Sequence, residues 1–450
     1  MLSRLGSSPT ESAGLLKWSL AIARRHWVFV ALMIAGLALR ALAQIAYRPA
    51  LLAVDSSKYL YNAYPGADPV GYKAPLKAIL AFGGLPAVTA IQHLLGLGMA
   101  VTIYAILLRR GTPRWLAAIA TAPVLLDAYQ IQVEQTIMPD VWFEALLLAG
   151  TAALLAAGQS GREAGNVKGG SVQRRMTRGL FAVIVAGLLL GATATVRQVG
   201  EILIVPALLY VLTVGAGWRA AVTRAAALAA AFAIPVLGYM AGSYVISGHF
   251  WLARATPSRE VAADGLKLFA MTRRSSQDGT PISRWQFQEF YPTYGNSVML
   301  DRRLTIVLGL RLTPGDPTIT LHALERGYGG RATVDKPVAS ALRTYQLHGG
   351  YTPGPLMAVF ALAGLAGSAL ALIRRPSGQG RGLGLACLAF FATGAAVLIA
   401  SDAFQFSWRY QLPALVTLPP AGAAALTLAG GYLASRARGG AGARPRVGPI

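Results

Sequence analysis

The chain alternates long apolar runs with short polar segments, many of them basic. About ten runs approach the roughly 20 residues that a helix needs to cross the hydrocarbon core of a bilayer. Hydrophobic residues make up 54% of the 450 residues and charged residues only 13%. A soluble protein of this length needs a larger charged surface. The sequence therefore predicts an all-α polytopic membrane protein with about ten transmembrane helices.

The ten expected spans follow one another with short connections, apart from one long polar loop between spans seven and eight. They cover approximately residues 27–45, 86–108, 115–126, 141–157, 180–196, 202–216, 225–246, 356–373, 383–400 and 412–432. With an even number of spans, every short basic loop falls on one side of the membrane, as the positive-inside rule requires. We therefore expect a multi-pass protein of the cell membrane with both termini in the cytoplasm.

This topology divides the chain into five expected parts. They are a cytoplasmic segment (1–25), a transmembrane module of about seven spans (26–248), an extracytoplasmic loop or cap (249–353), the last spans (354–433) and a basic cytoplasmic tail (434–450). The Ala41-Leu42-Ala43 triplet resembles a signal-peptidase site. Because the leader is long and Arg40 interrupts the apolar stretch, we expect the first span to be retained.

The net charge of +23 does not indicate nucleic-acid binding. The basic residues flank the spans, and no nucleic-acid-binding motif accompanies them. The single cysteine, Cys387, excludes a disulfide within the chain, and the five histidines lack metal-ligand spacing. We expect no metal and no cofactor, and a divalent cation is possible without being indicated.

The polar residues that stand out fall in segments expected to face outward. They are Asp55, Lys58 and Tyr59 in the first outward loop, Glu134 and Asp140 in the second, Arg197 after span five, and Asp402 and Arg409 between spans nine and ten. Each has a structural alternative. Asp140 caps a helix, Arg197 pairs with Glu201, and Arg409 extends to the lipid headgroups. Together they predict a cavity at the membrane face, with acids for proton transfer and arginines for phosphate.

Three motifs resemble a known superfamily. They are MPDVWFEALLLAG from Met138, LLLGATATVRQVGEILIVPALLYVL from Leu188 and WRYQLPAL from Trp408. With the acid Asp55 they resemble the GT-C glycosyltransferases, in the branch that holds protein O-mannosyltransferases and lipid A aminoarabinose transferases. The resemblance implies a polyprenyl-phosphate sugar donor and an acceptor reached from outside the cell. Many relatives carry an acidic pair where this chain has Asp55-Ser56.

We therefore expect an inverting membrane glycosyltransferase (EC 2.4 class) whose acceptor is a glycan, a lipid or a protein. Asp55 would act as general base, Arg197, Arg409 and Lys58 would neutralise the leaving phosphate, and the other site residues would bind substrate. Two alternatives stay open. A glycan ligase or polymerase is indicated by Arg273-Arg274, Arg302-Arg303, His322 and His348 in the long loop. A multipass transporter would carry its charges near the middle of the bilayer.

Overall fold

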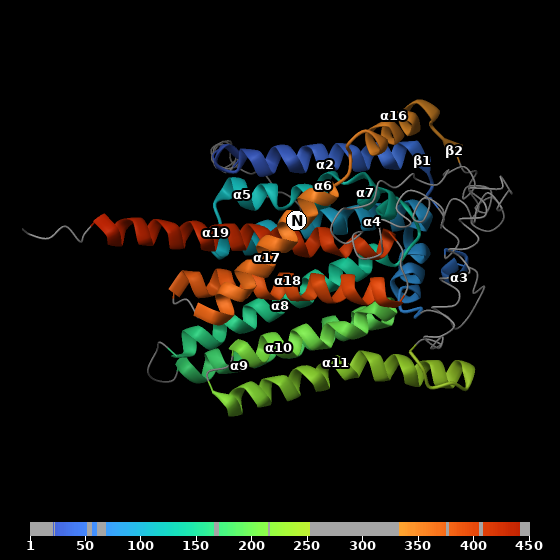
Figure 1. Ribbon diagram of the computed structural model, residues 1–450. Coiled ribbons are helices and arrows are strands. Elements are labelled where there is room, and N and C mark those ends of the chain that lie inside the picture. Colours follow the sequence, from blue (N-terminus) through green and yellow to red (C-terminus); the bar gives the residue numbers. More distant parts are fainter. Residues whose placement is uncertain are drawn as a thin grey trace, which may run out of the picture.

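The computed structural model is a bundle of long, roughly parallel helices (Figure 1). It describes residues 21, 23–51, 56–60, 69–165, 171–214, 217–252, 333–374, 378–404 and 408–441. Asp55, most of segment 1–25, most of loop 249–353 and most of tail 434–450 lie outside the described residues or side chains. The side chains of Lys58 and Asp402 also lie outside them, although their backbones belong to helices.

Each of the ten apolar runs is helical, in the order that the sequence predicts. The principal helices are α2 (Trp27–Ala46), α4 (Lys73–Arg109), α8 (Asp140–Gly165), α9 (Ser171–Val196), α11 (Trp218–Ser247), α17 (Gly354–Arg374), α18 (Gly378–Phe404) and α19 (Pro413–Ala441). Among the described residues, these eight are long and apolar enough to cross a membrane. The sequence predicts about ten spans, whereas the described residues contain eight, or nine if a bent pair of helices counts as one span.

The two remaining runs are broken or short, which explains the difference. The third run forms α5 (Arg114–Ile119) and α6 (Ala122–Leu126), and α7 (Ala128–Gln135) continues from them at an angle of 49°. The sixth run forms the 3-10 helix η1 (Gln198–Leu203) and α10 (Ile204–Val214), a 17-residue stretch. Neither the unbent helices of the third run nor the sixth run reaches the roughly 20 residues that a straight span needs.

The helix α4 is bent near its start. Gly84 has φ 66°, a left-handed conformation that glycine adopts without steric cost, and Pro86 follows inside the helix. Proline removes a backbone hydrogen bond of the helix, so the bend has a local cause in the sequence. The segment before the bend brings Tyr72 and Leu76 into the core, where both are fully buried.

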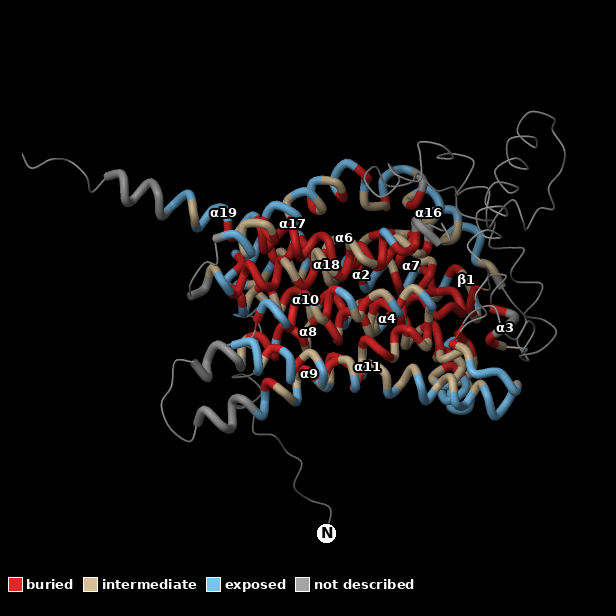
Figure 2. The backbone as a smooth tube through the Cα atoms, turned by 60° about the horizontal axis from the view of Figure 1, so that its bottom comes forward, coloured by how far each residue is buried: buried red, intermediate tan, exposed pale blue. Residues whose placement is uncertain are grey.

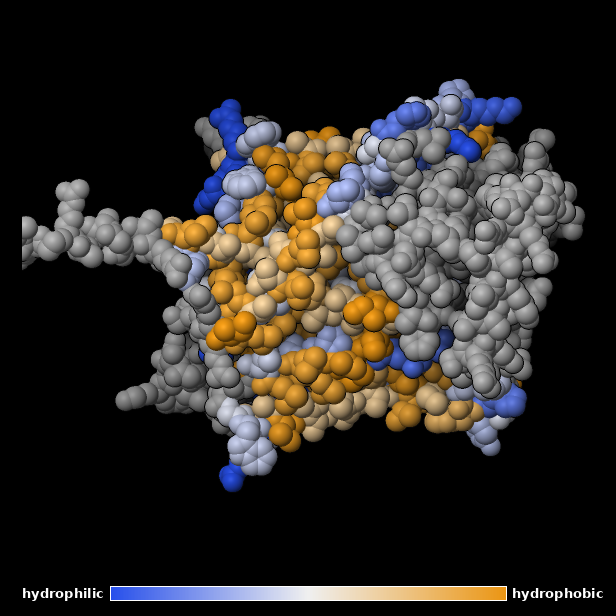
Figure 3. All heavy atoms as spheres, viewed as in Figure 1, coloured by the Kyte–Doolittle hydropathy of each residue, from blue (hydrophilic) through white to orange (hydrophobic). Residues whose placement is uncertain are grey.

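The interior of the bundle is apolar and tightly packed. Buried residues run through the middle of the bundle (Figure 2), and α8, α18 and α19 are the most buried of the spanning helices. Small residues allow close helix contacts, as at Gly187 of α9, where an added Cβ would lie 2.6 Å from the carbonyl oxygen of Leu228 in α11. The visible outer surface is apolar over the middle and hydrophilic toward both ends (Figure 3), as expected of helices surrounded by lipid.

The two ends of the bundle carry different structures. One end holds α3 (Ser56–Leu60), the strands β1 (Tyr47–Arg48) and β2 (Thr333–Val334), and α16 (Lys336–Leu347) (Figure 1). The strands pair antiparallel and so attach α16 to the end of α2. Toward the opposite end, the buried guanidinium of Arg110 donates to the carbonyl oxygens of Leu155 (2.7 Å) and Gly382 (3.2 Å).

Candidate functional site

Three polar residues from distant parts of the chain meet at the end of the bundle that holds α3. Asp140 is the first residue of α8, Arg197 links α9 to η1, and Arg409 lies in the 3-10 helix η3 (Trp408–Gln411) before α19. All three line one small cavity, together with Tyr410 and Phe143 among others. The sequence predicted that these three residues would share a membrane face, and the structure places them together.

The backbone around Arg197 explains the position of its side chain. Arg197 has an extended conformation (φ −144°, ψ 136°) between two helices, and its carbonyl oxygen accepts from Gly200 N (2.9 Å). A Cβ at Gly200 would lie 2.6 Å from backbone atoms of Thr193 and Ala194, so only glycine fits this turn without a shift. The break between α9 and η1 therefore points the guanidinium toward the start of α8.

Arg197 and Asp140 form a buried ion pair. The Nη2 atom of Arg197 lies 2.6 Å from Oδ2 of Asp140, and the side chains are 11% and 2% exposed. The guanidinium carbon lies 4.5 Å from the centre of the Tyr410 ring, a cation–π distance. The alternative partner, Glu201, is exposed one turn further along. The arginine is therefore held from two sides by residues distant in sequence.

Unsatisfied polar atoms remain in this pair. Nε of Arg197 and Oδ1 of Asp140 are buried and have no hydrogen-bond partner among the described residues. Burial is the largest single effect and lowers the pKa of the Arg197 guanidinium, but the Asp140 carboxylate together with Tyr410 and Tyr59 raises that pKa above its usual value. Arg197 therefore stays charged, with donor capacity left for an anionic ligand.

Arg409 lines the same cavity. Its guanidinium is buried, and Nη1 lies 3.6 Å from the sulfur of Met138. The cavity lining thus contains two guanidinium groups and one carboxylate. Arginine binds phosphate with parallel hydrogen bonds, so two guanidinium groups that line one cavity are suited to an anionic ligand.

The start of the first loop helix is attached beside this cavity. The hydroxyl of Ser56 donates to the carbonyl oxygen of Ile137 (2.8 Å), three residues before Asp140. Tyr59 is buried, and its ring meets the Tyr72 ring edge to face at 5.2 Å. Asp55, the predicted base, directly precedes Ser56 in the sequence and lies outside the described residues.

Glu134 has a different environment from Asp140. It is fully buried, and both its carboxylate oxygens accept from Arg40, at 2.7 Å each. His93 Nδ1 lies 2.9 Å from Oε2 of the same carboxylate, and its Nε2 lies 2.8 Å from the amide oxygen of Gln135. This buried cluster joins α2, α4 and α7. The sequence placed Glu134 among the substrate-binding residues, but in the structure its carboxylate is bound by Arg40 and His93.

A second buried carboxylate connects this cluster to the ion pair. Glu144 lies one helical turn after Asp140 on α8 and accepts from the Gln130 side chain (2.7 Å). The same Gln130 amide nitrogen lies 3.3 Å from Oε1 of Glu134. Hydrogen bonds through Gln130 therefore link Glu144 to Glu134, and Asp140 lies one turn from Glu144 on α8.

Sequence reasoning did not include four of these residues in the site: Arg40, His93, Glu144 and Tyr410. Ionisable residues inside apolar spans are energetically costly and are commonly functional or paired. Arg40, His93 and Glu144 lie in such spans, and that position could have identified them. The predicted site, in contrast, consisted of residues in the outward loops. The described residues contain no group of three or more His, Cys, Asp or Glu side chains placed to hold a metal ion.

No family model and no curated protein matches the sequence. Among solved structures, the chain is similar to the archaeal oligosaccharyltransferase AglB from Archaeoglobus fulgidus (14% identity, TM-score 0.47, 95% of this chain and 53% of that chain). It is also similar to ArnT from Cupriavidus metallidurans (12% identity, TM-score 0.37, 91% of this chain and 78% of that chain). A third similar structure is the S. cerevisiae protein O-mannosyltransferase Pmt1-Pmt2 complex (13% identity, TM-score 0.36, 50% and 34%).

The chain spans about half the length of the AglB chain (53%). All three neighbours are members of the GT-C superfamily of glycosyltransferases, the superfamily that the sequence motifs resemble. At these identities and scores the similarity carries no argument about chemistry, so any assignment of activity depends on the residues of the cavity.

Proposed function

We propose that this protein is an inverting membrane glycosyltransferase of the GT-C type, with a polyprenyl-phosphate sugar as donor. The acceptor is a glycan, a lipid or a protein on the extracytoplasmic side of the cell membrane. The observation that carries the proposal is the buried cluster of Arg197, Arg409 and Asp140 at one end of the bundle. A prenyl-phosphate donor requires a cationic site at the membrane face and an apolar surface for its chain.

In this proposal the two arginines bind the leaving phosphate. The acceptor hydroxyl attacks the anomeric carbon, the bond from that carbon to the phosphate oxygen breaks, and the phosphate leaves with the electron pair. Charge develops on the phosphate oxygens in the transition state, and preorganised cations stabilise that charge most. Asp140 holds the Arg197 guanidinium in place at 2.6 Å, which makes it a positioning residue as well as a neighbour of the substrate.

Asp55 takes the proton of the acceptor hydroxyl as general base. Support comes from its place in the chain, directly before Ser56, whose hydroxyl is bound to Ile137 beside the cavity. Lys58, Tyr59 and Asp402 belong to segments at the same end and complete the proposed substrate site. Both Glu134 oxygens accept from Arg40, so we assign Glu134 the role of holding that arginine rather than a sugar.

A transporter is the second candidate, and one observation favours it. Arg40, His93, Glu134 and Glu144 form a polar path inside the bundle, and buried ionisable residues often line ion pathways in membrane proteins. The glycan ligase or polymerase rests on loop residues that lie outside the described part of the chain, apart from the exposed His348.

The test of the proposal is transfer by the purified protein in lipid nanodiscs. Polyprenyl-phosphate sugars are supplied with total envelope acceptors, and the released prenyl phosphate is measured. The wild type releases prenyl phosphate only when acceptor is present, and Asp55→Asn lowers the rate by about 10²–10⁴ because it removes the base. A normally folded Asp55→Asn protein with more than about half the wild-type rate would exclude Asp55 from the reaction.

A further inference from the structure

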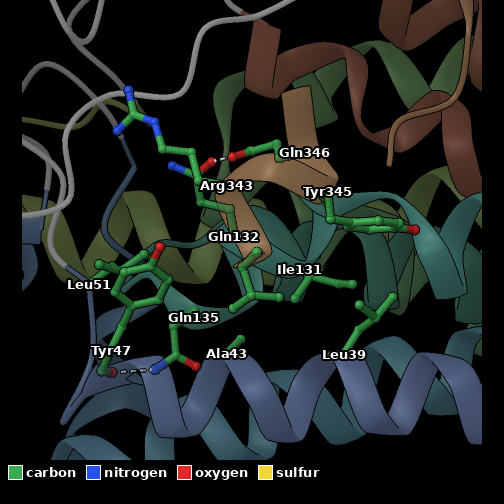
Figure 4. Close-up of a pocket in the computed structure, with 12 residues that line it drawn as sticks. Leu39, Ala43, Tyr47, Leu51, Ile131, Gln132, Gln135, Arg343, Tyr345 and Gln346 are labelled. Carbon is green, nitrogen blue, oxygen red and sulfur yellow. Dashed lines mark hydrogen bonds between the residues drawn. The ribbon is translucent and has the colours of Figure 1, made fainter. Parts of the chain in front are cut away.

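A second cavity lies at the same end of the bundle, away from the arginine cluster. It has a volume of about 50 Å³ and lies between α2, α7 and α16 (Figure 4). None of Asp140, Arg197 or Arg409 lines it. The proposed transfer reaction gives this cavity no role.

One wall of the cavity is an apolar stripe along α2. Leu39, Ala43 and Tyr47 are spaced four residues apart, so they lie along one face of the helix. Tyr47 is the residue that directly follows the end of α2. At a rise of 1.5 Å per residue the stripe is about 12 Å long. Ile131 of α7 and Leu342 of α16 face it. The cavity therefore runs along the axis of a helix that is long and apolar enough to span the membrane.

The other side of the cavity is polar. Gln346 of α16 donates to the side-chain oxygen of Gln132 of α7 (2.7 Å), and Gln135 donates to the carbonyl oxygen of Tyr47 (2.8 Å). Arg343 is exposed on α16 and lines the cavity at this polar side (Figure 4). Tyr345 is bound through its hydroxyl to the carbonyl oxygen of Leu126 (2.6 Å), which holds α16 against the bundle. The cavity is thus apolar along one helix and cationic at its rim.

The surroundings favour a lipid over a soluble ligand. Only 17% of the most apolar part of α2 is buried, so one side of this helix is open to the surrounding bilayer. Among the described residues, the exposed charges of β1 and of the segment that leads into and forms α16 include Arg48, Lys336 and Arg343 against Asp335. Asp335 also caps α16, because its carboxylate accepts from Val338 N (3.2 Å). Basic side chains on an interfacial helix attract anionic lipid headgroups.

We propose that this cavity binds an anionic phospholipid of the surrounding membrane. Its phosphate pairs with Arg343, and one hydrocarbon chain lies along the stripe from Tyr47 to Leu39. The bound lipid joins α16 to α2 and α7. This proposal does not depend on the proposed transferase activity, because the lipid is neither donor nor acceptor.

The test measures lipid binding to the purified full-length protein by native mass spectrometry. Phosphatidylglycerol and phosphatidylcholine with identical chains are titrated against the wild type, Arg343→Gln and the control Lys77→Gln, which removes an exposed lysine of α4 outside the cavity. We expect phosphatidylglycerol to bind at least about fivefold more tightly than phosphatidylcholine. Arg343→Gln should lose most of this preference, and Lys77→Gln should keep it.

A photoreactive phosphatidylglycerol with its reactive group in the chain gives a second readout on the unmodified protein. The expected crosslinks fall on residues 39–47 and on the peptide that contains Leu342. Ala43→Phe, which places a ring in the cavity, should remove these crosslinks.

Equal binding of the two phospholipids by the wild type would overturn the proposal. Crosslinks confined to other helices would do the same. Displacement of phosphatidylglycerol from these residues by equimolar polyprenyl phosphate would also overturn it, because the cavity would then belong to the sugar donor.

Discussion

The substitution Arg197→Lys distinguishes a phosphate-binding arginine from one that is only structural. A lysine keeps the positive charge next to Asp140, whose carboxylate lies 2.6 Å from the present guanidinium. It loses the planar fork that binds two phosphate oxygens in parallel. It also weakens the contact with the Tyr410 ring, whose centre lies 4.5 Å away. Cation–π contacts contribute about 0.5–2 kcal/mol, so the free energy of unfolding should fall by about 1 kcal/mol.

Catalytic efficiency should fall further than stability does. We expect Arg197→Lys to lose at least about tenfold in kcat/KM, which corresponds to about 1.4 kcal/mol of transition-state stabilisation. Arg197→Ala should be worse in both respects, because it leaves the buried Asp140 without its partner. Removal of one member of a buried pair costs about 3–5 kcal/mol. The double variant Arg197→Ala with Asp140→Asn should recover stability without recovering activity.

The assay combines turnover of a polyprenyl-phosphate sugar with unfolding of each variant in nanodiscs. Glu201→Gln is the matched control, since Glu201 is exposed and one turn from the arginine, and it should change neither quantity. Wild-type turnover in Arg197→Lys would refute the phosphate role of Arg197. Strong inactivation by Glu201→Gln would refute the assignment of Asp140 as the partner.

Two further predictions concern topology and the buried cluster. Reporter fusions after Arg110 should score cytoplasmic and fusions near Asp68 external, and the reverse pattern would invert the proposed orientation. Glu134→Ala should lower the free energy of unfolding by about 3–5 kcal/mol, because it leaves the guanidinium of Arg40 buried and without its carboxylate. Gly96→Ala should be destabilising too, since an added Cβ would overlap the Glu134 carboxylate, and normal melting of both variants would contradict the role given to the cluster.

The sequence predicted the helices well because apolar length is a local property. Every predicted apolar run is helical, and the expected boundary near Val141 agrees with a helix that begins at Asp140. The broken run that contains Leu126 was harder to predict. Asp127 interrupts it and caps the next helix, accepting from Tyr129 N (3.0 Å) and from Thr352 N (2.7 Å). The contact with Thr352 joins residues more than two hundred positions apart, and no local pattern predicts it.

The candidate site was predicted in part for a similar reason. Topology alone places Asp140, Arg197 and Arg409 at one face of the membrane. Each lies next to the end of a span that the predicted topology puts on the outer side. The identity of the partners depends on helix packing, so the sequence offered the near neighbour Glu201 as the alternative partner of Arg197, whereas the structure pairs Arg197 with Asp140. Arg40 was noticed as an interruption of a span, but its partner could not be predicted before α2 and α7 were placed side by side.

The most direct test of the central claim is the equilibrium binding of polyprenyl phosphate to the wild-type protein, compared with the same prenyl alcohol. Both ligands offer the same chain, so the difference between their dissociation constants isolates the contribution of the phosphate. The arginine cluster predicts that the phosphate binds at least about tenfold more tightly, and that Arg197→Lys loses most of this difference. Equal affinities for the phosphate and the alcohol in the wild type would contradict the account.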